Sequence, residues 1–531
     1  MRVQKQLVVL GIPLMLGCSD RARDVAPSTA GGTIVIATTS EPDGLFPPLP
    51  LNLEARQATE LIYEYLADVG PAMNTIGDSG FVKEIASAWR WSADSSSISF
   101  QIDPKARWSD GQQVTANDVA FSFSIYMNKV LASPTASSLA DIDSISVPAP
   151  STAVFWFNRK TPHQFYDAAS QMLILPAHIF ERVPIDSLRS RAGEMSPVGS
   201  GRFKLAGWNR GSTFELSAID DHYRGRSNPD RIIWSITPEY GSAVTRLLAG
   251  EADVFANVRL ESIKQLESSG KFDIVSLPGM DYVFLQLNLR KPVFASREMR
   301  RVLTMALDRQ SMVRNLFDTL AAVSIGPTVR AYPTTDTTFA QIPYDTARAS
   351  TILDSLGWQR SPRDGMRRRN GRPLRFTSIV PVSSLSRMRI AVLIQEQLHR
   401  AGIDMVIEQM DFGAFSDRQS KNDFEAAFAS WHLPSSTEAV KGAWTTGGAH
   451  NYGAYSNRAF DTLVDSALNA STVAASRGFF RQANQIIVDD VPAVWLYEPR
   501  ALLALNKRIK PTRMRPSAWW LDMASWKVDT Q

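Results

Sequence analysis

Residues 99–118 read SFQIDPKARWSDGQQVTAND, a stretch in which the pattern of a strand gives way to the start of a helix. Residues 98–102 alternate between apolar and polar, and a half-buried strand needs this period of two. Thr115, with Asp118 three residues later, resembles a capping box at the first turn of a helix. Because a strand pattern is followed by a helix pattern, this stretch favours a fold of the α/β class.

The same alternation continues on both sides of this stretch. Residues 33–37 form a short β-branched run, and residues 214–218 repeat the period of two. One helix is predicted to begin at Asp345 and end at Gly357, and another to end at Gly402, because glycine is a preferred C-terminal cap. The pattern predicts an α/β protein, and 531 residues are enough for two or three domains.

Composition narrows the class of protein further. With 44% hydrophobic and 21% charged residues, the chain is neither disordered nor a collagen-like repeat. The 57 basic and 53 acidic residues are interspersed, so a formal charge of +4 does not by itself indicate nucleic-acid binding. Cys18 is the only cysteine, which excludes intrachain disulfides and cysteine-based metal sites.

The N-terminus has the pattern of a secretion signal. Basic residues Arg2 and Lys5 precede an apolar run at 7–16, which is too short to cross about 30 Å of bilayer hydrocarbon but suits a signal peptide. Cys18 follows this run and resembles the lipidated cysteine of a bacterial lipobox, although an ordinary signal peptide with a chance cysteine is the alternative. We therefore expect a signal peptide at 1–17, a lipidated N-terminus and tether at 18–32, and an anchor outside the cytoplasm.

Motifs of catalysis are missing from the sequence. There is no Walker-type phosphate loop, no dinucleotide-binding glycine motif and no G-x-S-x-G elbow. Residues 77–80 look like a trypsin-type serine motif, but that order requires an upstream histidine and His163 is the first in the chain. The six histidines form no zinc-binding pair. Residues 360–372 hold six arginines around two turn dipeptides, which predicts an exposed hairpin rather than a nucleic-acid site. We expect no enzyme activity, no cofactor and no metal.

A resemblance covers nearly the whole chain after residue 30. Residues 31–43, GGTIVIATTSEPD, resemble the opening of the family 5 extracellular solute-binding proteins, which are the oligopeptide, dipeptide and nickel receptors of ABC importers. Later landmarks follow in the family's order: 85–91, 99–118, 197–201 (with Arg202 in place of a proline), 247–254, 287–309, 344–358, 451–468 and 491–497. The sequence is identified as a member of this family on these landmarks together.

The resemblance implies a bilobal fold of the type II periplasmic binding proteins, in the large class with an extra subdomain. The first lobe would comprise 31–281 and 499–531, with the subdomain at about 53–197, and the second lobe 290–495. Two hinge strands, expected at Tyr282–Leu289 and Val494–Tyr497, would join the lobes.

The resemblance also implies a function: an extracytoplasmic lipoprotein that binds oligopeptides between its lobes and delivers them to a membrane permease. A separate ATPase would supply the energy, and the receptor would act as a monomer. A nickel chelate or an oligosaccharide remains an alternative solute. A periplasmic hydrolase or a chaperone on the same fold is a remoter alternative.

Peptide-binding members carry an acidic residue after a wall tryptophan, where it pairs with the peptide's α-ammonium group. Trp431 matches that tryptophan, but Pro434 stands at the acidic position, and Glu438 or Glu41 could take its place. Stacking by two tryptophans and hydrogen bonding by an asparagine are the expected contacts. The expected cleft residues are Glu41, Tyr282, Phe284, Trp431, His432, Asn451, Tyr452 and Trp495. Tyr282 and Phe284 could instead belong to the core.

Overall fold

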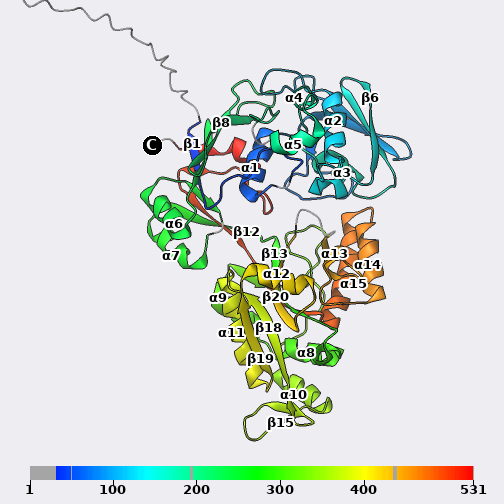
Figure 1. Ribbon diagram of the computed structural model, residues 1–531, viewed down its shortest axis with the longest axis vertical. Coiled ribbons are helices and arrows are strands. Elements are labelled where there is room, and N and C mark those ends of the chain that lie inside the picture. The colour runs from blue at the N-terminus through cyan, green and yellow to red at the C-terminus, as the bar shows by residue number, and fades with distance from the viewer. Residues whose placement is uncertain (1–30, 50, 192–194, 257, 434–438, 530–531) are drawn as a thin grey trace, which may run out of the picture.

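The computed structural model describes residues 31–49, 51–191, 195–256, 258–433 and 439–529. The predicted signal peptide, Cys18, the tether, Pro434 and Glu438 lie outside these residues. Two bodies, each built around a large β-sheet, are arranged along the long axis of the molecule (Figure 1). We call the body that contains Gly31 the first lobe and the other body the second lobe.

A seven-stranded sheet forms the centre of the first lobe. Its order is β12 (Phe272–Leu277), β22 (Ala501–Asn506), β11 (Val254–Ala256), β1 (Thr33–Thr38), β10 (Arg231–Ile236), β9 (Thr213–Ala218) and β8 (Phe203–Asn209). Strand β1 pairs in parallel with both β10 and β11. The returning strand β22 is inserted between β12 and β11, so the C-terminal segment completes this sheet.

A four-stranded sheet stands beside it in the same lobe. Its order is β4 (Ala86–Trp91), β5 (Ser97–Ile102), β7 (Thr152–Phe157) and β6 (Ile142–Ala149). The predicted strand is confirmed in β5, and the predicted helix is α2 (Ala116–Tyr126). The capping box is also confirmed, because the Thr115 backbone N–H donates to Asp118 Oδ2 at 2.8 Å.

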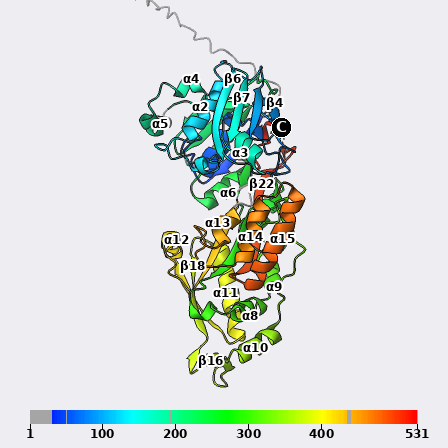
Figure 2. The ribbon, with the colours of Figure 1, turned by 90° about the vertical axis from the view of Figure 1, so that its right-hand side faces the viewer.

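A six-stranded sheet forms the centre of the second lobe. Its order is β14 (Ala321–Val323), β21 (Ala493–Pro499), β13 (Asp281–Leu287), β20 (Ala426–His432), β18 (Arg375–Pro381) and β19 (Asp404–Met410). Helices α14 (Arg458–Leu468) and α15 (Val473–Asp490) lie side by side (Figure 2). The helix predicted after Asp345 is α10 (Thr346–Ser355), and α11 (Leu385–Arg400) ends before Gly402, as expected.

The remaining helices and short strands cover these sheets. They include α1 (Leu53–Ile62), α3 (Gln164–Ser170), α4 (Ala177–Phe180), α5 (Ile185–Arg191), α6 (Tyr240–Ala249), α7 (Leu260–Ser268), α8 (Arg297–Met305), α9 (Arg309–Phe317), α12 (Phe412–Ser420), α13 (Ala439–Trp444), β2 (Ala67–Asp68), β3 (Val82–Lys83), β15 (Gln359–Arg360), β16 (Arg367–Arg369), β17 (Arg372–Pro373), β23 (Ile509–Lys510) and β24 (Lys527–Val528). Within the described ranges, none of the helices combines the length and apolar character needed to span a bilayer.

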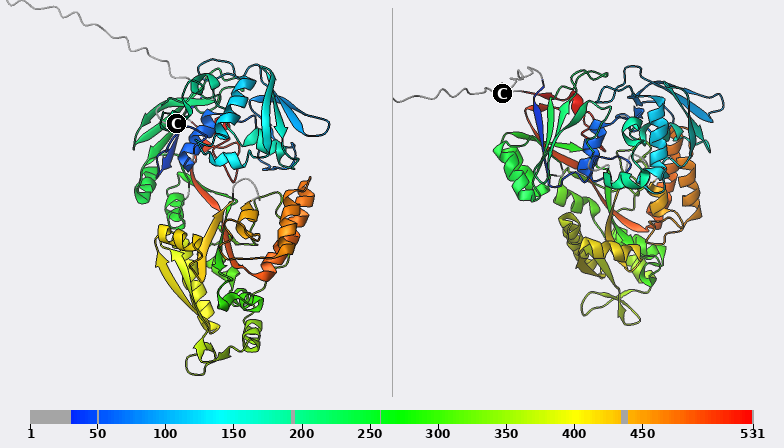
Figure 3. Two further views of the ribbon diagram at one scale, coloured as in Figure 1. Left: turned by 45° about the vertical axis from the view of Figure 1, so that its right-hand side comes forward. Right: turned by 45° about the horizontal axis from the view of Figure 1, so that its top comes forward.

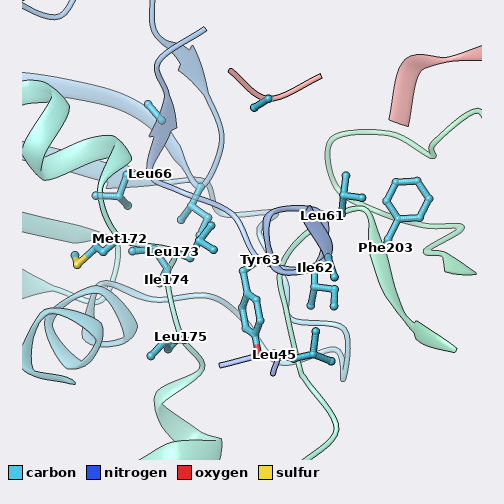
Figure 4. Packing of buried hydrophobic residues seen from close by; sticks show 14 of the residues in the cluster. Leu45, Leu61, Ile62, Tyr63, Leu66, Met172, Leu173, Ile174, Leu175 and Phe203 are labelled. Carbon is cyan, nitrogen blue, oxygen red and sulfur yellow. The ribbon is translucent and has the colours of Figure 1, made fainter. Parts of the chain in front are cut away.

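The core of the first lobe joins the helix α1 to the four-stranded part. Figure 4 shows Tyr63, which follows α1, beside the buried segment Met172–Leu175, whereas Leu61 lies near Phe203. The motif at 197–201 closes over the same helix end. A side chain at Gly199 would place its Cβ only 1.9 Å from the Ile62 carbonyl oxygen, so only glycine fits there.

The chain crosses between the lobes at two adjacent points. It enters the second lobe through residues 278–280, between β12 and β13, and returns through Pro499 and Arg500, between β21 and β22. The two crossings touch, because a Cβ on Gly279 would lie 1.7 Å from the Pro499 carbonyl oxygen. The predicted crossings, Tyr282–Leu289 and Val494–Tyr497, lie mostly in β13 and β21, next to these points. They are apolar because those strands are central in the second sheet and buried.

In both large sheets, the carboxyl ends of the parallel strands point toward the region between the lobes. In the first lobe β12, β11, β1 and β10 run parallel, and β12 ends where the chain enters the second lobe. In the second lobe β13 begins at that crossing, β20 is antiparallel to it, and β18 and β19 follow the direction of β20. Ligand sites of α/β sheets lie outside the carboxyl ends of the strands, so the region between the lobes is where a ligand is expected (Figure 3).

Candidate functional site between the lobes

A cavity of about 680 Å³ lies between the two lobes. Its first-lobe wall comes from residues 137–141 and 159–171, around the start of β6 and helix α3. Its second-lobe wall comes from Tyr282, residues 431–433 at the end of β20, helix α13, and residues at the end of α14. Because both lobes contribute, a bound solute would touch residues far apart in the sequence.

Aromatic rings form much of the second-lobe wall. The Trp431 ring stacks on Tyr452 with centroids 6.3 Å apart and meets the edge of His450 at 5.5 Å. The indole N–H of Trp431 is buried and has no hydrogen-bond partner in the described part of the chain. A buried donor without a partner costs stability, and an acceptor on a solute that reached this N–H would remove that cost.

His432 lies beside this wall in an ion pair with Asp281. The two residues are opposite each other in the β13–β20 register, and His432 Nδ1 lies 3.1 Å from Asp281 Oδ1. The hydrogen bond with Asp281 raises the pKa of His432, which favours the charged imidazole. With Nδ1 held by the carboxylate, Nε2 is the ring atom that remains to contact a solute.

Polar groups form most of the first-lobe wall. Arg159 Nε donates to Asp141 Oδ1 at 2.8 Å, and His163 Nδ1 lies 3.0 Å from the Thr75 carbonyl oxygen. The Thr161 hydroxyl is buried and has no hydrogen-bond partner among the described residues. One wall is therefore aromatic and the other polar, an arrangement that suits a solute with both apolar and hydrogen-bonding groups.

A second cavity, of about 450 Å³, lies at the carboxyl ends of β1, β10 and β11. Its lining is polar: Thr38 donates from Oγ1 to Glu54 Oε1 at 2.9 Å, and Glu239 accepts from the first backbone N–H groups of α6. Those backbone donors hold the pKa of Glu239 below its usual value. Both neighbours of β1 are parallel to it, so this cavity occupies the switch point of the first sheet.

Three of the expected cleft residues, Tyr282, Trp431 and His432, line the interlobe cavity. Tyr452 stacks against Trp431 from behind. Glu41 lines neither of these cavities. Its Oε1 accepts from the Trp208 indole N–H at 2.7 Å and its Oε2 from the Gly211 backbone at 3.1 Å, so first-lobe donors already bind its carboxylate.

The other expected contacts belong to the interior. Phe284 and Trp495 are buried in the core of the second lobe, where both pack against Trp444. Asn451 uses its side-chain amide to donate to the Thr445 and Tyr455 carbonyl oxygens, at 2.9 and 2.7 Å, so it fixes its own loop. In each case the side chain is already engaged in packing or hydrogen bonds within the second lobe, and the sequence does not show these contacts. Pro434 and Glu438 lie outside the described residues, so the acidic partner of an ammonium group stays a prediction.

Sequence reasoning missed the first-lobe wall altogether. Arg159, His163 and Tyr166 follow β7 in the sequence, where no motif distinguishes them from a surface loop. Lys441 and His450 were also missed, although both follow the Trp431 segment closely and could have been found by proximity to it. Among the described residues, no group of three or more histidine, cysteine or acidic side chains is arranged to hold a metal ion.

Comparison with known proteins gives a consistent result. Residues 80–452 match the model of the bacterial extracellular solute-binding proteins, family 5 Middle. The oligopeptide-binding protein AppA of Bacillus subtilis (strain 168) is 26% identical over 509 residues, covering 92% of each chain. The solved structure of AppA from Bacillus subtilis, in complex with a nonapeptide, has a TM-score of 0.74 at 24% identity and covers 94% of this chain and 99% of that one. The crystal structure of NikZ from Campylobacter jejuni, in complex with Ni(L-His), has a TM-score of 0.76 at 20% identity and covers 93% and 99%.

Proposed function

The chain belongs to the bacterial extracellular solute-binding proteins of family 5, and from this premise we propose that it is the solute receptor of an ABC importer and binds oligopeptides between its lobes. The observation that carries this proposal is the cavity of about 680 Å³, to which both lobes contribute a wall. A peptide has a polar backbone and mixed side chains, and these match one polar and one aromatic wall.

Closure of the lobes would follow from the two crossings. Gly279 and Pro499 are in contact, so a rotation there changes few other contacts and acts as a hinge. A solute favours the closed form only through contacts that it makes better in that form. Shifting a 1:99 equilibrium to 99:1 needs about 5.5 kcal/mol of such preference. A peptide that touches both walls could supply it.

Specific groups in the cavity are assigned to peptide recognition. The Trp431 indole N–H and the Thr161 hydroxyl, both buried without a partner in the described chain, would hydrogen-bond the peptide backbone. The Trp431 ring would pack on an apolar side chain. His432 Nε2 would donate to a carbonyl or carboxylate oxygen, because Asp281 favours the charged ring.

The proposal also covers the membrane anchor of the receptor and its division into lobes. The signal peptide would be residues 1–17, Cys18 would carry lipid, and residues 18–32 would tether the protein outside the cytoplasm. The lobes would be 31–281 with 499–531 and 290–495, and the subdomain about 53–197. The receptor would act as a monomer, perform no reaction, and deliver its solute to a permease driven by a separate ATPase.

A nickel chelate is the second candidate solute. Three of the six histidines in the chain, His163, His432 and His450, line the interlobe cavity. Imidazole is a common nickel ligand, and NikZ, which has the same fold, was solved with Ni(L-His). The aromatic wall and the unpartnered N–H favour a peptide over this alternative.

Mass spectrometry of the solute that co-purifies with the full-length protein tests the proposal. A mixture of peptides is the expected result, and a nickel complex or a sugar would overturn the choice of solute. With added trialanine, the free energy of unfolding should increase with concentration as RT ln(1+[L]/Kd), and the melting temperature should rise with it. The nickel–histidine complex should not shift the melting temperature. Mass spectra of the peptide after incubation should show no cleavage, and cleavage would overturn the assignment as a receptor.

A further inference from the structure

The far end of the second lobe carries a dense cluster of positive charge. Residues 359–375, which we call the basic tip, hold seven arginines and one aspartate, for a formal charge of +6. The whole chain has a charge of +4, so the rest of the chain is at −2. The tip contains the small sheet β15–β16–β17, and it lies at the opposite end of the long axis from the first lobe (Figure 1).

Two arginines of the tip are exposed and unpaired. The Arg363 and Arg372 guanidinium groups have no hydrogen-bond or ion-pair partner among the residues that the structure describes, and they stand near the two turns of the small sheet. Arg368 pairs with Asp364 at 2.7 Å, but both side chains are about two-fifths exposed, so water screens this pair. The positive field of the tip is therefore only partly neutralised by its own chain.

The backbone of the tip is held in place from beneath. Arg367 is 2% exposed, and its guanidinium donates to Asp354 Oδ1 at 2.7 Å and to the Trp358 carbonyl oxygen at 2.6 Å. Its backbone N–H donates to the Gly402 carbonyl oxygen at 2.8 Å. This arginine is structural, whereas the exposed arginines around it are presented on a fixed base.

A groove of about 570 Å³ adjoins the tip. Apolar side chains of Pro292, Val293 and Trp358 line it, together with Arg369 and Arg372. The Arg369 guanidinium lies over the Trp358 ring at 4.7 Å. Positive groups beside a tryptophan and other apolar side chains are the composition of surfaces that sit at a membrane interface.

We propose that the basic tip binds the anionic headgroups of a phospholipid bilayer. Guanidinium groups bind phosphate through two parallel hydrogen bonds, and several basic side chains at an anionic surface add their attraction. The exposed arginines are spread over the protruding hairpin and the edge of the adjoining groove, a distribution that fits a broad charged surface better than one acidic peptide. The proposal does not depend on the solute or on the interlobe cavity.

Orientation of the receptor would follow. Strand β1, near the start of the described chain, lies in the first lobe, and the basic tip lies at the other end of the molecule (Figure 1). A basic patch is a recognised second attachment beside a lipid anchor. With both ends attached, the long axis would lie along the membrane and the cleft would be held at a fixed height above it.

Sedimentation with vesicles tests the proposal. The full chain with Cys18→Ser, which removes the proposed lipidation site, is mixed with vesicles of phosphatidylglycerol and phosphatidylcholine, or of phosphatidylcholine alone. We expect preferential binding to the anionic vesicles that weakens as salt is raised. The double variant Arg363→Glu/Arg372→Glu should lose this preference by about tenfold or more.

A matched double variant separates the contribution of the basic tip to vesicle binding from the contribution of net charge. Arg182→Glu/Lys264→Glu makes the same charge change at exposed first-lobe positions and should retain binding. Equal losses in both double variants, or no preference of the parent for anionic vesicles, would overturn the proposal. Tighter binding to duplex DNA than to the vesicles would overturn it too. The circular dichroism spectra of both double variants should match that of the parent. If the tip variant misfolds, Arg363→Gln/Arg372→Gln replaces it, and a smaller loss of preference for anionic vesicles is expected.

Discussion

Polar groups in the first-lobe interior and polar groups in the cleft are satisfied in different ways. In the interior, Arg224 donates from one nitrogen to Glu64 Oε1 at 2.6 Å and lies 3.1 Å from Glu84 Oε1. In the cleft, the Trp431 N–H and the Thr161 hydroxyl have no partner in the described chain. The interior charges neutralise one another, which is a structural role, whereas Trp431 and Thr161 line the interlobe cavity, where a solute can approach them.

A second interior pairing reinforces the contrast. Arg515, in the C-terminal segment, pairs with Asp68 and also donates to Asp522 at 2.9 Å, and its side chain is only 7% exposed. These contacts tie the returning chain to the segment after α1. The charged pairs at the cleft, His432 with Asp281 and Arg159 with Asp141, are more exposed, with side chains from 26% to 66% exposed. Substitutions should therefore act on stability in one region and on binding in the other.

The largest effect is expected from Arg515→Ala. Removing one partner of a buried pair leaves Asp68 without a counter-ion, so the free energy of unfolding should fall by about 3–5 kcal/mol. Thermal and urea unfolding followed by circular dichroism measure the loss. Arg246→Ala, which removes the exposed pair with Glu251, is the control and should cost about 0–1 kcal/mol. Similar losses in both variants would contradict the contrast.

Glu84→Gln is expected to change how stability depends on pH. Burial raises the pKa of Glu84 from 4.5 to about 8, an effect that Arg224 opposes and Glu64 strengthens. Because the folded pKa lies above the unfolded one, the proton on Glu84 stabilises the fold fully below pH 4.5, and this contribution is lost as the pH rises to about 8.

The amide cannot ionise, so the variant should gain about 2–4 kcal/mol over the wild type between pH 5 and pH 9. Its carbonyl oxygen can still accept the Tyr65 backbone N–H, which donates to the native carboxylate at 2.9 Å. Urea unfolding at both pH values measures the difference. The same stability difference at both pH values would show that Glu84 is charged throughout.

Trp431→Phe is expected to weaken solute binding by about tenfold, or about 1.4 kcal/mol, with little change in the melting temperature. Phenylalanine keeps an aromatic ring for stacking, but it removes the unpartnered N–H together with part of the indole surface. Calorimetry with the peptide identified by mass spectrometry measures the affinity. Trp156→Phe, at a 43% exposed tryptophan outside the cavity, should bind as the wild type does. Unchanged affinity in Trp431→Phe would remove this N–H from the proposed site.

The smallest effect is expected from Asp281→Asn. The hydrogen bond with Asp281 raises the pKa of His432, so the pair stabilises the fold fully below the unfolded pKa, and this contribution is lost as the pH rises through the folded pKa. Both side chains are largely exposed, so the change in stability should stay below about 1 kcal/mol. Nuclear magnetic resonance titration of His432 should show a lower pKa in the variant, and an unchanged titration would exclude the pair in solution.

Local pattern was enough for the class of the fold and for part of the site. The alternation at 98–102 and the capping pair Thr115 and Asp118 correctly predicted β5 and α2. Trp431 and its neighbour His432 were expected at the cleft because Trp431 matches the wall tryptophan of the family, and both line the interlobe cavity. Periodicity and caps act over a few residues, so they can be read from one segment at a time.

Tertiary structure decided which side chains face the cleft and which are covered. Phe284 and Trp495 are aromatic residues in apolar strands, as Tyr282 is, so local pattern does not distinguish the three. Packing around Trp444 places Phe284 and Trp495 in the core. Residues 159–171 reach Trp431 only because the chain crosses between the lobes at Gly279 and Pro499 with the carboxyl ends of both sheets facing each other. Such contacts depend on the order of strands in two sheets, which no short stretch of sequence contains.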